Sequence, residues 1–151
     1  MKYRRFSFIE ILIGVGIIAV LAAIVIVIIN PTRQFSHARD SQRWSDVNTI
    51  LNAIHQRMVD NKGSFAEGST CDALPSIAKF ISSVIGDNNI NICDCLVTDY
   101  LTAMPYDPSA KGAAYTDCDN YTTGYTIIKI DTGRITVSAP SAELDAISVT
   151  R

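Results

Sequence analysis

Four cysteines give this chain its clearest capacity for covalent chemistry, and they are Cys71, Cys93, Cys95 and Cys118. An even number of cysteines in an exported domain predicts two disulfides rather than free thiols. Their C-x21-C-x-C-x22-C spacing lacks the C-x2-C pair of zinc knuckles, so we do not expect a zinc site. A bridge between the two central cysteines would be strained. We therefore expect each outer cysteine to pair with one of the central two, in either of the two possible crossings.

Aspartates surround the cysteines, and calcium is the metal that such carboxylates would hold. They are Asp94, Asp99, Asp107, Asp117 and Asp119. The sequence contains no D-x-[DN]-x-[DN]-G calcium loop, and aspartate is also a common turn residue. We therefore expect no metal or other cofactor, with calcium as the alternative.

Two histidines, His37 and His55, are 18 residues apart. On one helix this spacing places them about 27 Å from each other, so they cannot share a metal ion and we expect both to face solvent. No serine, glycine or lysine motif of a hydrolase or nucleotidase is present. The net charge of -2 comes with no basic patch for nucleic acid. We therefore expect neither an enzyme nor a nucleic-acid-binding protein, and assign no catalytic residue.

Glu10 is the ionisable residue in the most unusual setting. It precedes residues 11–29, which contain no charged side chain. A carboxylate costs about 2–3 kcal/mol at the middle of a bilayer and less near its surface. Glu10 must therefore either hydrate near the cytoplasmic surface or find a partner.

The apolar segment over residues 6–29 is long enough to cross a membrane. As a helix its 24 residues would span about 36 Å, against a hydrocarbon core of about 30 Å. A cleavable secretory signal would have a shorter apolar region and a small-residue cleavage site. Here the segment continues into Asn30-Pro31-Thr32-Arg33-Gln34, so we expect a retained anchor. The basic residues 1–5 predict a cytoplasmic start and an outward-facing remainder.

Two glycines, Gly14 and Gly16, weaken this helix by up to about 1 kcal/mol each relative to alanine. They favour either local extension of the helix or close packing of helices in the membrane.

A second, amphipathic helix is predicted over residues 31–62, and Pro31 either starts it or kinks one continuous helix. Its apolar stripe consists of Trp44, Val47, Ile50, Leu51, Ile54 and Met58. Gly63 is a plausible C-cap. Surface ion pairs at helical spacing are expected among Arg39, Asp40, Arg43 and Asp46.

The remaining residues predict a small globular part. We expect a short helix over residues 76–85, closed by Gly86, a helical turn over 96–101 and a rigid loop at Pro105-Tyr106-Asp107-Pro108. A β-rich segment over residues 124–130, a turn at Asp131-Thr132-Gly133 and an alternating segment over 134–139 predict a hairpin, with a third strand over 146–150.

The predicted fold class is α+β: a long N-terminal helix, transmembrane in its first half and amphipathic in its second, packed on a small antiparallel β-sheet domain. The predicted organisation is a basic leader (1–5), a transmembrane or filament-core helix (6–30), an amphipathic helix (31–62) and an extracytoplasmic globular domain (63–151).

The start of the chain resembles a known family. A short basic leader, then Phe6-Ser7-Phe8-Ile9-Glu10, then an unbroken apolar run is similar to the N-terminal methylation segment of type IV pilins and of type II secretion pseudopilins. Residues 30–34 and 38–43 also look like pilin sequences, as do residues 100–108 before a hairpin. In this resemblance Phe6 matches the first residue of the mature chain and Glu10 the fifth.

The resemblance implies a mechanism. A prepilin peptidase in the membrane would cut between Arg5 and Phe6 and methylate the new amine of Phe6. Glu10 would then pair with that amine in a neighbouring copy and set the register of subunits. The family normally has glycine where this chain has Arg5, so inefficient processing, a variant peptidase and an uncut anchored form all stay open.

The function expected from the resemblance is that of a structural pilin subunit of a type IV pilus-like filament. Its partners would be other copies of itself, the membrane, the peptidase and the pilus assembly machinery. It would begin as a membrane-anchored precursor and end in an extracellular filament at the cell surface. The alternatives are a secretion pseudopilin, a membrane-anchored binding or adhesion domain that never assembles, and a membrane-anchored enzyme.

Overall fold

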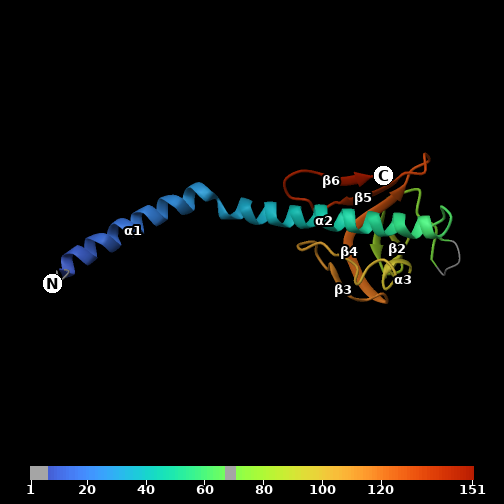
Figure 1. Cartoon of the computed structure of the whole chain (residues 1–151), viewed down its shortest axis with the longest axis horizontal. Helices are drawn as coiled ribbons and strands as arrows, with labels where there is room; N and C mark the ends of the chain where they lie inside the picture. Colours follow the sequence, from blue (N-terminus) through green and yellow to red (C-terminus); the bar gives the residue numbers. More distant parts are fainter. Residues whose placement is uncertain (1–6, 67–70) are drawn as a thin grey trace. The chain divides into compact units, whose positions relative to one another are not determined.

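The computed structural model describes residues 7–66 and 71–151 of the chain (Figure 1). The chain divides into two compact units between Ser36 and His37. The first unit contains α1 (Phe8–Ile29) and the start of α2 (Pro31–Asp60). The second contains the rest of α2 and the sheet.

Helix α1 starts after Ser7, whose backbone is extended and whose carbonyl accepts hydrogen bonds from the N–H groups of Glu10 and Ile11. Its residues are aliphatic apart from two glycines, the alanines, Phe8 and Glu10. A helix with apolar residues all round cannot form an amphipathic stripe, and such a helix is typical of a buried or membrane-spanning segment.

The two helices are separate elements. Asn30 adopts a left-handed conformation with φ of 46°, which ends α1. Pro31 is the first residue of α2, a position that tolerates its missing N–H group. The Asn30 side chain and carbonyl both accept a hydrogen bond from the Arg33 N–H. Of the two alternatives for Pro31, the structure has the one in which it starts a helix.

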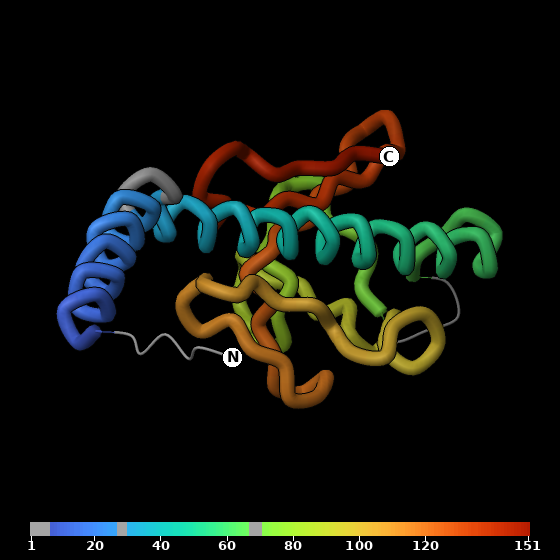
Figure 2. The backbone as a smooth tube through the Cα atoms, turned by 60° about the vertical axis from the view of Figure 1, so that its left-hand side comes forward, coloured from blue at the N-terminus to red at the C-terminus, as the bar shows by residue number. Residues whose placement is uncertain are grey.

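From His37 onward α2 lies across the sheet, as Figures 1 and 2 both show. One face of this helix enters the core with the fully buried Val47, Ile50, Leu51 and Ile54. The predicted stripe is therefore confirmed at its centre, whereas Trp44 is 45% exposed. The helix ends as expected, because Gly63 has a φ of +93° and its N–H donates to the Met58 carbonyl.

The sheet faces α2 with alternating residues. Its strand order is β2-β1-β4-β5-β6, with β3 also paired to β4. These strands are β1 (Lys79–Ser82), β2 (Asn89–Ile90), β3 (Ala114–Asp117), β4 (Asn120–Lys129), β5 (Ile135–Ala139) and β6 (Ile147–Thr150). Along β4, Tyr121, Thr123, Tyr125 and Ile127 are buried while their neighbours are not. This period of two is what a sheet covered on one face requires.

The hairpin prediction is confirmed. Ile127 pairs with Val137 across β4 and β5, and β6 adds as the third antiparallel strand. The α+β class is also correct, but the sheet is mixed rather than antiparallel, because β1 and β2 run parallel with Ile81 beside Ile90.

The helix predicted over residues 76–85 is wrong, since this segment contains strand β1. Its apolar residues recur at helical spacing, yet Ile81 is buried while Ile77, Phe80 and Val84 are exposed. Hydrogen bonds to β4 decide the conformation, including one from the Thr123 hydroxyl to the Ile81 carbonyl. The helical turn expected over 96–101 lies earlier, as α3 (Cys93–Leu96).

Candidate functional site

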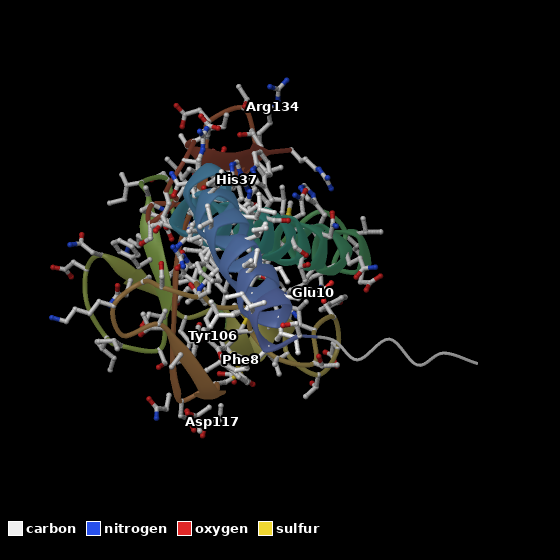
Figure 3. All side chains as sticks on the ribbon, turned by 90° about the vertical axis from the view of Figure 1, so that its left-hand side faces the viewer. Phe8, Glu10, His37, Tyr106, Asp117 and Arg134 are labelled. Carbon is white, nitrogen blue, oxygen red and sulfur yellow. A yellow bond between two sulfur atoms is a disulfide. The ribbon has the colours of Figure 1, made fainter. Side chains whose placement is uncertain are left out.

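The surface of α1 is the first candidate site. All of its described side chains from Phe8 to Ile26 are exposed apart from the half-buried Gly14. The segment Phe8–Ile26 has a mean hydropathy of 2.9 and is long and apolar enough to cross a membrane, a property that signal sequences share. Figure 3 labels Phe8 and Glu10 in the first turns of α1. Glu10 is the one charged residue on this helix.

The proposed processing site lies outside the described residues, since these begin at Ser7 and exclude both Arg5 and Phe6. The two glycines of α1 lie within the described residues. A methyl group added at Gly14 or Gly16 would meet nothing within 4 Å beyond the local helix backbone. Within the described chain, therefore, no packing contact requires glycine at these two positions.

Two disulfides stabilise the second unit. They join Cys71 to Cys95 and Cys93 to Cys118. Each outer cysteine is thus paired with one central cysteine, as the sequence predicted, and the structure selects one crossing. The two bridges close loops with sequence separations of 24 and 25 residues. Closing a loop of this size lowers the conformational entropy of the unfolded chain, and in the chain-entropy account each bridge thereby stabilises the fold by about 3 kcal/mol.

A buried cluster around Arg43 is the second candidate site. Its guanidinium donates to both oxygens of Asp107, with Nε–Oδ2 at 2.7 Å and Nη2–Oδ1 at 3.0 Å. Nη1 donates to Asp40 at 2.6 Å and to Glu143 at 3.3 Å, and Nη2 also donates to the Ser109 hydroxyl. The side chain of Arg43 is fully buried. A buried cation is tolerated when its donors are satisfied in this way.

The cluster joins three segments far apart in the sequence. Asp40 accepts hydrogen bonds from the backbone N–H groups of Glu143 and Leu144, which attaches the β5–β6 connection to α2. Asp107 accepts from the N–H groups of Ser109 and Ala110, which shapes the loop that it belongs to. Arg39 pairs with Glu143 at the margin of the cluster.

These contacts shift the pKa values of Asp107, Asp40 and Arg43. Burial raises the pKa of Asp107, but the hydrogen bonds from Arg43 and from two backbone N–H groups outweigh it, so the pKa lies below its ordinary value. The pKa of Asp40 is lowered in the same way against its own desolvation. The hydrogen bond to Asp107 raises the pKa of Arg43 further, so the cation is permanent. The cluster holds fixed charge at neutral pH, which suits a structural role better than proton transfer.

Sequence reasoning placed Asp40 and Arg43 in surface pairs and read Asp107 as part of a rigid loop. The Asp40–Arg43 pair is present, but both residues are buried, and the surface location is therefore wrong. The signal that could have found the cluster is the position of Arg43 on the buried side of the helix, four residues before Val47.

A second arginine, Arg57, holds the end of α2 to the disulfide region. Its Nε donates to the Phe65 carbonyl at 2.8 Å and its Nη1 to the Cys95 carbonyl at 3.0 Å. Its guanidinium also lies over the Phe65 ring, 5.5 Å from the centroid.

The calcium alternative finds no support in the geometry. In residues 7–66 and 71–151, no three His, Cys, Asp or Glu side chains are grouped so that they could hold a metal. Asp107 is bound by Arg43, and Asp117 accepts hydrogen bonds from the N–H groups of Asp119 and Asn120 in a turn.

His37 is exposed as expected, whereas His55 is half-buried and its Nε2 has no hydrogen-bond partner among the described atoms.

Comparison of the chain with family models, with curated proteins and with solved structures finds no match in any of the three.

Proposed function

We propose that this chain is a structural subunit of a membrane-anchored filament of the type IV pilin kind, assembling through α1. The observation that carries the proposal is the surface of α1: 19 residues with aliphatic side chains on every side, and a single carboxylate near the start. Exposed apolar surface on this scale requires a cover. Lipid would cover it before assembly, and the same helices of other copies would cover it in the filament.

Glu10 would set the register of neighbouring copies. In a surrounding of low dielectric an unpaired carboxylate is strongly disfavoured, and an ion pair there is weakly screened. The amine of Phe6 in an adjacent subunit would supply the matching charge. A subunit out of register would leave both charges unpaired, so the pair would select one axial position.

The second unit would be the part displayed outside the membrane. Its two disulfides are typical of an oxidising compartment, which agrees with export. The permanent charges around Arg43 are used in internal ion pairs, consistent with a rigid body that is carried by the filament rather than with catalysis.

The test is substitution of Glu10 in the full chain in its producing cells. Glu10→Ala should leave membrane insertion intact and abolish filaments, whereas Glu10→Asp should retain some assembly because it keeps the charge. Electron microscopy of sheared surface material measures the filaments, and membrane fractionation measures insertion. Normal filaments from Glu10→Ala would reject the register role. Absence of filaments from the unaltered chain would instead favour an anchored domain that never assembles.

Processing of the leader is tested separately by mass spectrometry of the N-terminus of assembled material. Cleavage after Arg5 predicts a chain that begins at Phe6 with a methylated amine. A chain that still carries Met1 in assembled filaments would contradict the processing step, and Glu10 would then need another cation.

A further inference from the structure

We infer that the two ends of β4 form complementary docking surfaces, so that the β4–β5 turn of one copy of this chain inserts into a hollow at the other end of the sheet of a second copy. This inference rests on the filament function proposed above and names a contact between the second units of adjacent subunits.

The hollow lies beside the loop that joins β1 to β2 and has a volume of about 650 Å³. We call it the acidic hollow, because Asp72, Asp87 and Asp119 line it. Val84 and Ile85 also line it, and Ile85 is fully exposed at the tip of the loop. A fully exposed isoleucine next to another exposed aliphatic residue in a hollow is typical of a surface that a partner covers.

The complementary surface is the turn between β4 and β5, which we call the basic turn. Ile130 is 37% exposed there and supplies an apolar contact. Arg134 is exposed and makes no ion pair with any described residue, and Lys129 likewise has none. Asp131 carries the opposite charge in this turn. The backbone of Arg151 pairs with that of Ile135, but its guanidinium donates to Asn48 and Asn52 of α2 and is not part of the basic turn.

The charges on the two surfaces match. Among the described residues that line the acidic hollow, Lys79 is the one base against three carboxylates. A hollow lined by aliphatic side chains and carboxylates fits a turn that presents Ile130 together with the cations Lys129 and Arg134. Such charge complementarity between two surfaces fixes orientation and partner choice.

Asp119 of the acidic hollow and Arg134 of the basic turn are separated by the length of β4, while the hollow also extends along β1 to Lys79, which pairs with Ile127. Asp119 directly precedes this strand, and Arg134 follows the turn after it. Ten residues of strand span roughly 30 Å. Figure 3 shows Asp117, the last residue of β3, and Arg134 at opposite ends of the sheet. A contact between two different surfaces of one molecule is heterologous, and it generates an open polymer unless the rotation closes a ring.

A second copy is a better occupant of the hollow than a lipid surface. The three carboxylates would be repelled by the anionic headgroups of a membrane. In a filament, the association of α1 helices would hold copies close together, and even a weak contact is then populated because its effective concentration is high.

The test uses charge reversal in the full chain, with the filament yield of sheared material as the measurement. One variant carries Arg134→Glu and the other carries Asp87→Lys together with Asp119→Lys. These side chains are exposed and make no hydrogen bond with any described residue, so folding should be unaffected. Each variant alone should lose at least about tenfold in yield, because like charges would then face each other. Lys111→Glu, which reverses an exposed charge elsewhere, should not.

Co-expression of the two variants provides the decisive arm. In a filament in which the two variants alternate, the reversed turn of one variant meets the reversed hollow of the other. The unaltered turn and the unaltered hollow also meet. The yield should therefore return to within about threefold of normal. Unchanged yield from either variant alone, or no recovery on mixing, overturns the inference. If Glu10→Ala abolishes filaments while the reversals do nothing, the filament function stands without this contact. If the unaltered chain forms no filaments, both proposals fail.

Discussion

Asp107 accepts two hydrogen bonds from the guanidinium of Arg43, at 2.7 Å and 3.0 Å, and neither side chain is exposed to solvent. The two residues are 64 positions apart in the sequence. Their contact fixes the loop after α3 to the first turns of the part of α2 that covers the sheet. The second unit therefore has a buried ion pair between α2 and this loop in addition to its apolar core.

Removal of one partner should be costly. Asp107→Asn keeps the shape of the side chain and removes the charge, which leaves Arg43 buried without its main counterion, and it should lower the free energy of unfolding by about 3 kcal/mol. Asp99→Asn, at an exposed carboxylate, should change it by less than about 0.5 kcal/mol. Urea unfolding of the full chain in detergent micelles, followed by tyrosine and tryptophan fluorescence, measures both. Equal effects of the two substitutions would show that the pair does not stabilise the fold.

Acid should weaken the second unit through the same carboxylates. The folded-state pKa values of Asp40 and Asp107 lie below their ordinary values, so the folded protein holds fewer protons than the unfolded chain in that range. Their contribution is complete above the unfolded pKa near 4 and is lost as pH falls through the lower folded values. Asp46 acts in the opposite direction, because burial raises its pKa despite the hydrogen bond from Tyr125.

The expected result is a free energy of unfolding that declines as pH falls below about 4. In Asp107→Asn the decline should be shallower, since one of the two titrating groups with a lowered pKa is missing. Unfolding curves over a pH series test this. An identical slope in the variant and the unaltered chain would contradict the assignment of the acid sensitivity to Asp107.

Local patterns in the sequence were sufficient for the elements whose partners are close along the chain. A β-rich segment over residues 124–130 and an alternating segment over 134–139 flank a short turn, and this predicts the hairpin in which Ile127 pairs with Val137. The pattern failed where distant contacts decide. Spacing of three residues places Asp40 beside Arg43 whether the pair is exposed or buried. Contacts with distant residues, Asp107 and Glu143 among them, bury the pair, and no local period contains that information.

The same limit explains the segment that forms β1. Apolar residues at 77, 80, 81 and 84 satisfy a helical period, but a short segment of this kind has little intrinsic stability as a helix. Pairing with β4 provides hydrogen bonds that the isolated segment lacks, including one from Thr123 to the Ile81 carbonyl. The crossing of the disulfides was likewise beyond sequence reasoning, because it depends on which central cysteine the fold brings to Cys71.

Gly124 should be the glycine least tolerant of substitution in the second unit. Its φ is +79°, and an added Cβ would lie 2.9 Å from the Cβ of Ala110 and 3.0 Å from that of Asp107. Gly133 is a matched control, with a φ of +83° and nothing within 4 Å. Alanine at either position meets the strain of a left-handed backbone, about 1–2 kcal/mol. Gly124→Ala adds overpacking of about 1–3 kcal/mol, so it should lower the free energy of unfolding by clearly more than Gly133→Ala.

The clash at Gly124 also acts on the ion pair, because an added methyl group would push Asp107 away from Arg43. The two substitutions at Gly124 and Asp107 should therefore be non-additive: Asp107→Asn should cost less in the Gly124→Ala background than alone. A double-mutant cycle of urea unfolding measures the coupling, and the same cycle with Gly133→Ala should show none. Full additivity at Gly124 would mean that the sheet absorbs the methyl group elsewhere, and that the close approach of β4 to the Asp107 loop does not position the carboxylate.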